Sequence, residues 1–167
     1  AFSTPKPYNA KSLAIELAKR TRFLRDQVIS EELKEEEQKQ SGYLFGFYKA
    51  FKEHLIASLT HKDFANLYAQ TIAYGLFIAR HRYEMRPTLF EKNPQKESTL
   101  FTRDQAYKFI QPSLGILREL FKFISSEEPS KQLRVMVDDI ADLLAAADLE
   151  KVVKSFYKEN GEKDPII

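Results

Sequence analysis

The stretch FANLYAQTIAYGLFIARHR, residues 64–82, decides the fold of this chain. Its apolar residues recur at intervals of three and four, the spacing of one helix face: Phe64, Leu67, Tyr68, Thr71, Ile72, Gly75 and Leu76. A second stripe runs beside the first and is formed by Ala65, Ala69, Ala73 and Phe77. A helix that is apolar on two sides is covered by neighbours on both sides. We therefore expect a central helix whose alanines and Gly75 let those neighbours approach closely.

The same stretch is not expected to cross a membrane. Its uncharged part, residues 64–79, is shorter than the roughly 20 apolar residues that a bilayer requires. It also contains the polar side chains of Asn66, Gln70 and Thr71.

Composition places the chain among globular proteins. It has 167 residues, of which 43% are hydrophobic and 30% charged, which is enough for one domain with its own core. The net charge of +2 carries no strong nucleic-acid signal. The absence of cysteine excludes disulfides, thiolate zinc sites and a cysteine nucleophile, and it fits a reducing cytoplasm. We expect a single domain over residues 1–167, with an extended lead-in at 1–8 and a link toward a further element at 161–167.

Helical periodicity recurs on both sides of the central helix. Asn9 or Ser12 can cap a first helix that runs to about Ile29, with a buried stripe of Leu13, Leu17, Thr21, Leu24 and Val28. The glutamate-rich residues 30–41 form either a solvated helix or a connection. A further helix is predicted over residues 43–59, with Leu44, Phe47, Tyr48, Phe51, Leu55 and Leu59 on one face. Thr102 is expected to cap a short helix, with Gln105 closing a capping box. The remaining helices are predicted after Pro112 through residue 124, from Ser130 onward, and over residues 149–160. No run alternates with a period of two, so we predict an all-α bundle of about six to eight helices without a sheet.

Basic side chains gather at two places. The first helix carries Lys19, Arg20, Arg22 and Arg25, and the far end of the central helix carries Arg80, Arg82 and Arg86. One interpretation is a solvated surface, with the cations of the first helix favoured by its dipole. The other is a contact with DNA phosphates or with an acidic neighbouring domain.

No pattern in the chain indicates an active site. Asp138 and Asp142 share one helix face, and Asp139 is turned about 100° away, which favours a solvated surface over a carboxylate site. The three histidines lack the spacing of helical metal ligands. There is no glycine-rich phosphate loop and no nucleophile elbow. We therefore expect no catalytic residue, no bound cofactor and no metal in this chain.

Several segments, in this order, resemble one family: PYNAKSLAIELAKRTRFLRDQVI (7–29), DFANLYAQTIAYGLFIAR (63–80), FTRDQ (101–105), VDDIADLLAAAD (137–148) and GEKDPII (161–167). They are similar to the helical spacer, or connector, upstream of the methyltransferase domain in type IIG and type ISP-like restriction–modification enzymes. These enzymes fuse an adenine-specific DNA methyltransferase to a nuclease. The resemblance implies that S-adenosylmethionine and Mg²⁺ belong to domains outside this segment. The implied partners are the neighbouring nuclease and methyltransferase domains of the same chain, and DNA through the full-length enzyme.

Three hypotheses follow for the function. The first is a connector that positions nuclease and methyltransferase domains in a cytoplasmic enzyme of bacterial defence. The second is an auxiliary helical module that binds the DNA backbone through the two basic groups. The third is a helical enzyme centred on Asp138, Asp139 and Asp142.

Overall fold

The computed structural model describes residues 8–84, 101–111, 113 and 115–159. Within this part of the chain the secondary structure is entirely helical, which confirms the predicted all-α bundle. The elements are α1 (Ala10–Phe23), the π-helix η1 (Leu24–Ile29), α2 (Ser30–Lys39), α3 (Tyr43–His54), α4 (His61–Glu84), α5 (Arg103–Ala106), the 3₁₀ turn η3 (Tyr107–Phe109), α6 (Gly115–Ile124), α7 (Lys131–Ala146) and α8 (Leu149–Glu159).

The first three elements form one continuous helical rod, from α1 through η1 to α2, about 45 Å long. A capping box opens it, because the Asn9 side chain accepts from the Ser12 backbone N–H and the Ser12 hydroxyl accepts from the Asn9 backbone N–H. The rod ends at Gln40, whose backbone is left-handed with φ 52°. The glutamate-rich segment is therefore a helix, and the predicted boundary near Ile29 is wrong. Buried Leu33 extends the apolar stripe beyond that point.

Helix α4 is the central element that the sequence predicts. Phe64, Tyr68, Ile72 and Leu76 are buried along one face of it. The Thr60 hydroxyl accepts from the Asp63 backbone N–H and caps its start. Leu67 is an exception to the predicted face, because it is exposed. Despite its length, α4 does not have the hydropathy of a bilayer-spanning helix, and neither does any other helix in the described residues.

Gly75 is the point of closest approach on α4. A Cβ atom added there would lie 2.2 Å from Cζ of Phe121, a fully buried side chain of α6. The expectation that small residues on the central helix admit close neighbours is confirmed at this position.

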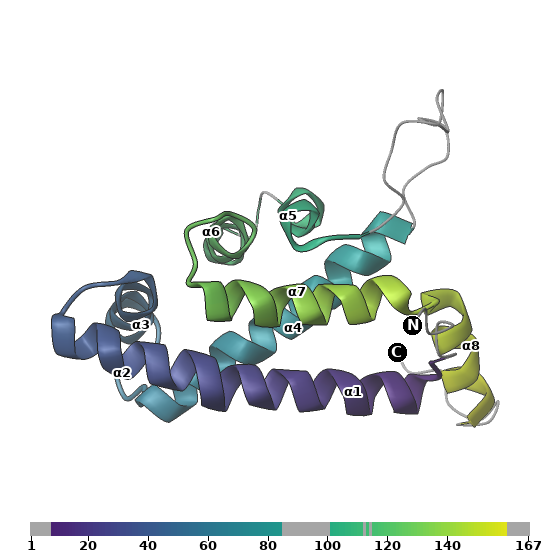
Figure 1. Ribbon diagram of the computed structural model, residues 1–167, viewed down its shortest axis with the longest axis horizontal. Coiled ribbons are helices and arrows are strands. Elements are labelled where there is room, and N and C mark those ends of the chain that lie inside the picture. The colour runs from purple at the N-terminus through teal and green to yellow at the C-terminus, as the bar shows by residue number, and fades with distance from the viewer. Residues whose placement is uncertain (1–7, 85–100, 112, 114, 160–167) are drawn as a thin grey trace.

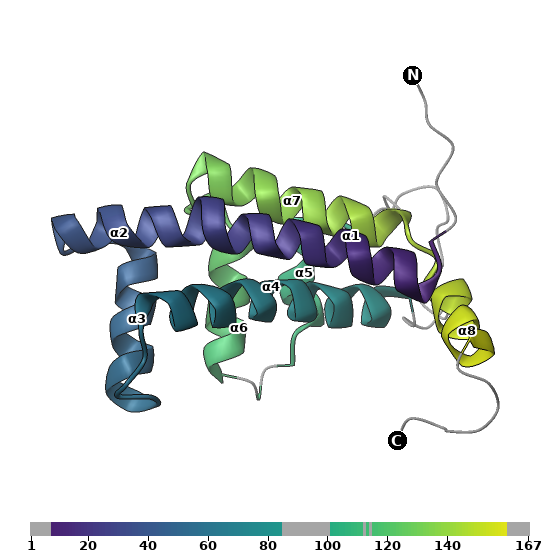
Figure 2. The same ribbon diagram turned by 90° about the horizontal axis from the view of Figure 1, so that it is seen from below.

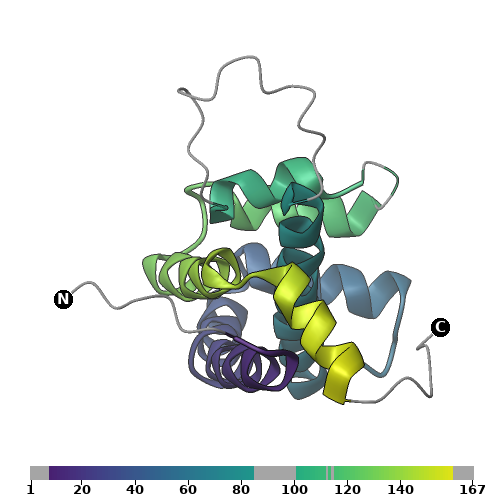
Figure 3. The same cartoon turned by 90° about the vertical axis from the view of Figure 1, so that its right-hand side faces the viewer.

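Helices α1 and α7 run along the long axis of the molecule, α4 crosses them obliquely in Figure 1, and the three helices pack on one another (Figures 1 and 2). The end-on view in Figure 3 shows α8 lying across one end of this group. There the backbone N–H of Ala10, at the start of α1, donates to the hydroxyl of Ser155 in α8, at 2.9 Å. The first and last described helices therefore meet at one end of the body.

Two local predictions on the shorter helices are wrong. Helix α3 ends at His54, so Leu55 leaves the helical face and is exposed rather than packed. The Thr102 side chain makes no cap bond to the backbone of α5 and instead donates to Asp104 at 2.6 Å, so no capping box with Gln105 forms. By contrast, the Ser130 hydroxyl caps α7 as predicted, accepting from the Leu133 N–H at 3.1 Å. Residues 1–7 of the predicted lead-in at 1–8, and the whole predicted link at 161–167, lie outside the described residues.

Candidate functional site

A groove with a volume of about 580 Å³ lies between α1 and α4. Helices α1 and α4 run in opposite directions beside it (Figures 1 and 2). The residues that line it are Ala14, Leu17, Ala18, Thr21, Arg22 and Arg25 from α1 and η1, and Asn66, Gln70, Ala73, Tyr74 and Phe77 from α4. We refer to these residues as the α1–α4 groove.

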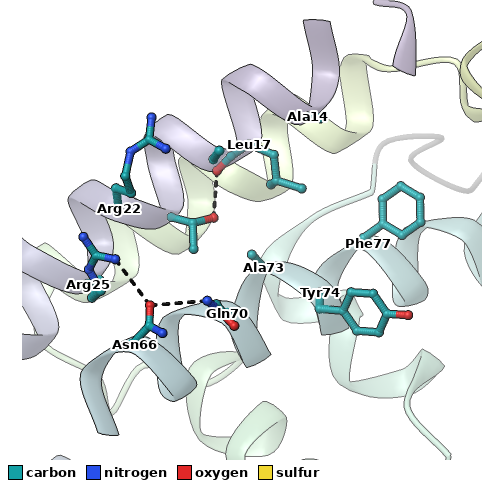
Figure 4. Close-up of a pocket in the computed structure, with 11 residues that line it drawn as sticks. Ala14, Leu17, Arg22, Arg25, Asn66, Gln70, Ala73, Tyr74 and Phe77 are labelled. Carbon is teal, nitrogen blue, oxygen red and sulfur yellow. Dashed lines mark hydrogen bonds between the residues drawn. The ribbon is translucent and has the colours of Figure 1, made fainter. Parts of the chain in front are cut away.

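Small side chains keep the groove open. Ala14 and Ala18 line it from α1 and Ala73 lines it from α4, and these three small side chains leave space between the two helices. Leu17 and Phe77 lie in the space between the helices and are only partly buried (Figure 4). The sequence predicted Leu17 as a core residue, and the helical period alone could not reveal that it is only partly covered.

Thr21, also predicted as buried, is likewise half-buried in the groove. Its hydroxyl donates to the Leu17 carbonyl at 2.7 Å, so its hydrogen-bonding capacity is used within α1. Tyr74 is 69% exposed at the opposite wall. The groove therefore combines a partly covered apolar floor with an exposed aromatic rim.

One end of the groove is cationic. Arg25 donates from Nη1 to Asn66 Oδ1 at 3.3 Å across the two helices, and Gln70 Nε2 donates to the same oxygen at 3.3 Å (Figure 4). Arg25 also holds both carboxylate oxygens of Asp26, at 2.6 and 2.9 Å. The hydrogen bonds from Arg25 keep the pKa of Asp26 below its usual range. Arg22 lies on the α1 rim and, among the residues that the structure describes, makes no hydrogen bond or close ion pair.

The other two members of the basic group predicted on the first helix, Lys19 and Arg20, form ion pairs within the fold. Lys19 and Arg20 both pair with Glu16, at 3.0 and 2.9 Å, and these bonds lower the pKa of Glu16. Arg20 additionally forms an ion pair with Asp139 at 3.1 Å, which joins α1 to α7. These two side chains are outside the groove.

The basic group at the far end of α4 is held within the fold. Arg80 is only 9% exposed and donates to the carbonyls of Leu144 and Ala147, at 3.0 and 3.2 Å. These are carbonyl groups at the C-terminal end of α7, which a cation stabilises. Arg82 donates to the Phe109 carbonyl at 3.1 Å. Arg86 lies outside the described residues, so Arg22 and Arg25 are the predicted contact residues that the structure places at the groove.

Sequence reasoning missed one buried arginine, Arg103. Its Nε donates to Asp138 at 2.8 Å, and its Nη1 donates to the carbonyls of Ile124 and Ser126, both at 2.6 Å. Arg103 therefore joins α5, the end of α6 and α7. The available signal was its spacing of three from buried Ala106, which places both residues on one helix face.

The three aspartates of α7 do not form a shared site. Asp138 binds Arg103, Asp139 pairs with Arg20, and Asp142 is exposed. Partial shielding of the Asp142 carboxylate from water raises its pKa, and the negative charges of Asp138 and Asp139 raise it further. The expected solvated surface fits all three, since the Asp138 and Asp139 side chains are 50% and 48% exposed, but these two also join helices. Within the described ranges, no group of histidine, aspartate and glutamate side chains could hold a metal ion.

Fold and groove together define the class of this protein, an all-α bundle with an open channel between two antiparallel helices. Comparison of the chain with protein-family models, curated proteins and solved structures found no match.

Proposed function

We propose that this chain is the helical connector of a DNA restriction–modification enzyme, which holds a nuclease and an adenine methyltransferase in a defined orientation. It works in the cytoplasm and performs no chemistry of its own. S-adenosylmethionine, Mg²⁺ and the recognised DNA are bound by the neighbouring domains of the full-length enzyme.

The proposal rests on one observation: three buried or partly buried arginines join the helices of the bundle to one another. Arg20 links α1 to α7, Arg80 links α4 to α7, and Arg103 links α5 and α6 to α7. In an enzyme, buried charged groups converge on a cleft where they meet a substrate. Here each of these three guanidinium groups binds a carbonyl or a carboxylate of another helix. That arrangement suits a body that transmits orientation.

The contact between Ala10 and Ser155 specifies what such a connector would do. The start of α1 and helix α8 lie at one end of the bundle, so in this proposal the length of the rod does not separate the flanking domains. The connector would set the angle between them, and the rest of the bundle would be a rigid support for that junction.

Assays of the 167-residue chain test the absence of chemistry. We expect it neither to transfer a methyl group to DNA nor to cleave DNA, and isothermal titration with S-adenosylmethionine should produce no binding heat. A measurable affinity for S-adenosylmethionine would overturn the proposal. The genomic reading frame offers an independent test: nuclease and methyltransferase motifs should flank this segment, and a frame that codes for neither would contradict it.

Arg22 is exposed and has no hydrogen-bond partner within the described part of the chain, which favours a second candidate: an auxiliary module that binds the DNA backbone through Arg22, Lys19 and Arg25. Phosphate contacts predict an affinity that falls steeply as salt rises. A gel-shift series on duplex DNA from low to high salt tests this candidate. Absence of binding at the lowest salt would remove it.

A further inference from the structure

We infer that the α1–α4 groove binds an amphipathic helix of a protein partner, with the apolar stripe of that helix along the groove and a carboxylate at the end formed by Arg22 and Arg25. This inference goes beyond the connector proposal and does not depend on it, because the helix can belong to the same polypeptide or to another one.

The length of the groove fits a helix. Its α1 side extends from Ala14 to Arg25, which is about 16 Å or three helical turns. Helices α1 and α4 run in opposite directions on the two sides of the groove, so a third helix laid into it would pack against both. Side chains at positions i, i+4, i+7 and i+11 of such a helix would lie along the groove.

Exposed apolar side chains extend the contact surface beyond the groove itself. Ile15 is 45% exposed on α1, and on α4 Leu67 is 38% and Tyr74 69% exposed. Ile15 lies next to Ala14 and Ala18 on the helix surface, and Leu67 and Tyr74 are seven residues apart on one face of α4. An apolar groove that is flanked by exposed apolar residues on both helices is typical of an interaction site.

The charged side chains at one end of the groove favour a partner helix with a negative group at the matching end. Arg22 and Arg25 bring two positive charges to one end, and Asp26 offsets one of them through its bond with Arg25. The remaining charge matches a single carboxylate, or the negative end of a helix dipole. At the other end, Ala14 and Phe77 are apolar.

The backbone of the groove walls argues against other occupants. The N–H and C=O groups of α1 and α4 are bonded within their own helices, and an extended peptide binds by pairing with a free strand edge. An α-helix satisfies its own backbone and needs only apolar contact. A nucleic-acid backbone would place several phosphates over mostly apolar walls with one net positive charge, which gives little counterion release.

Designed peptides provide the test. The first probe is a 14-residue fluorescein-labelled peptide with leucine at the four groove-facing positions and two glutamates at its C-terminal end, and a second has the glutamates at its N-terminal end. Matched peptides carry lysine in place of glutamate, or serine in place of leucine. Fluorescence anisotropy against the 167-residue chain should detect binding of one glutamate peptide and none of the serine peptide.

Variants of the protein locate the binding. Ala18→Arg places a long side chain in the groove and should weaken binding at least tenfold. Arg22→Glu should weaken binding of the glutamate peptide about tenfold, equivalent to about 1.4 kcal/mol, and should restore binding of the lysine peptide. Lys49→Glu, on the exposed surface of α3, is the control and should leave binding unchanged. Circular dichroism melting curves verify that each variant folds.

Several outcomes would overturn the inference. These are the absence of any anisotropy change up to 1 mM protein, equal affinity in the wild type and Ala18→Arg, or no recovery with the lysine peptide. Self-association that is detected by analytical ultracentrifugation and abolished by Ala18→Arg would reassign the groove to a second copy. Displacement of the peptide by duplex DNA would reassign it to nucleic acid. None of these outcomes bears on S-adenosylmethionine binding or on the reading frame, so failure here is distinct from failure of the connector proposal.

Discussion

Two faces of α4 are built in opposite ways. The face toward α6 and α7 is closed, because Gly75 admits the ring of Phe121 and the Arg80 guanidinium binds the end of α7. The face toward α1 is open, although it too has a small residue, Ala73. Small residues therefore permit close packing only where a neighbouring helix inserts a large side chain against them. Where none arrives, they leave a groove.

The largest expected effect is on the closed face. Gly75→Val would force side-chain atoms into the space of Phe121, whose ring is fully buried and cannot move aside. We expect a loss of about 3 kcal/mol in the free energy of unfolding, since overpacking outweighs the gain in helix propensity. Urea unfolding followed by circular dichroism measures this loss.

Gln70→Val is the matched control on the open face of the same helix. Its side chain faces the groove, so the change should cost no more than about 0.5 kcal/mol. Equal losses in the two variants would mean that the two faces are packed alike.

A second, smaller difference concerns arginine. Arg80→Met keeps an apolar chain of similar length but leaves the Ala147 carbonyl without its Arg80 donor and the Leu144 carbonyl with only the Ala147 backbone N–H, at 3.3 Å. We expect a loss of about 2 kcal/mol in the free energy of unfolding, against about 0.5 kcal/mol or less for Arg22→Met at the groove. Thermal melts of both variants measure the difference, and a Tm for Arg80→Met that matches Arg22→Met would contradict the role given to Arg80.

The two regions should also respond oppositely to acid. Glu32 accepts a hydrogen bond from Ser130 near the α4–α7 side, and burial raises its pKa. Its folded form therefore holds a proton more tightly than the unfolded chain, so its contribution to stability increases as pH falls through the raised pKa. Asp26 at the groove has a lowered pKa because of Arg25, so its contribution is lost as pH falls through that lowered value.

Stability measured from neutral pH to about pH 3, in wild type, Glu32→Gln and Asp26→Asn, tests these signs. Glu32→Gln should remove a gain on acidification, and Asp26→Asn should remove a loss. The Asp26 effect is the smallest of the series, because that ion pair is exposed to solvent. The same sign of change in both variants would show that their environments do not differ as described.

The sequence predicted those parts of the fold that depend on local pattern. The periodicity of residues 64–82 identified the central helix, and residue type limited the first cap to Asn9 or Ser12 and indicated the close approach at Gly75. The fate of Arg80 was not predictable from pattern, because its carbonyl partners are 64 and 67 residues away. In the sequence, a charged residue at the end of an apolar run has the same pattern whether its side chain is solvated or binds the end of another helix.

The groove was hidden from the sequence for a related reason. Leu17 and Thr21 continue the apolar stripe that includes fully buried Leu24, and helical period cannot distinguish a covered position from an uncovered one. The π-helical turn of Leu24–Ile29 had no signal either, since its residues continue the same stripe. Only the arrangement of α1 against α4 reveals which part of the stripe lacks a neighbour.

The most direct test of this account compares two adjacent residues of α4. The chain contains no cysteine, so Ala69→Cys and Gln70→Cys each introduce a single thiol, one on a fully buried position and one in the groove. Under native conditions, we expect a thiol-specific reagent to modify the Gln70→Cys variant at nearly the rate of the unfolded chain. The Ala69→Cys variant should react at least a thousandfold more slowly, limited by opening of the fold. Equal protection of the two thiols would mean that the α1–α4 groove is closed and that α4 has no open face.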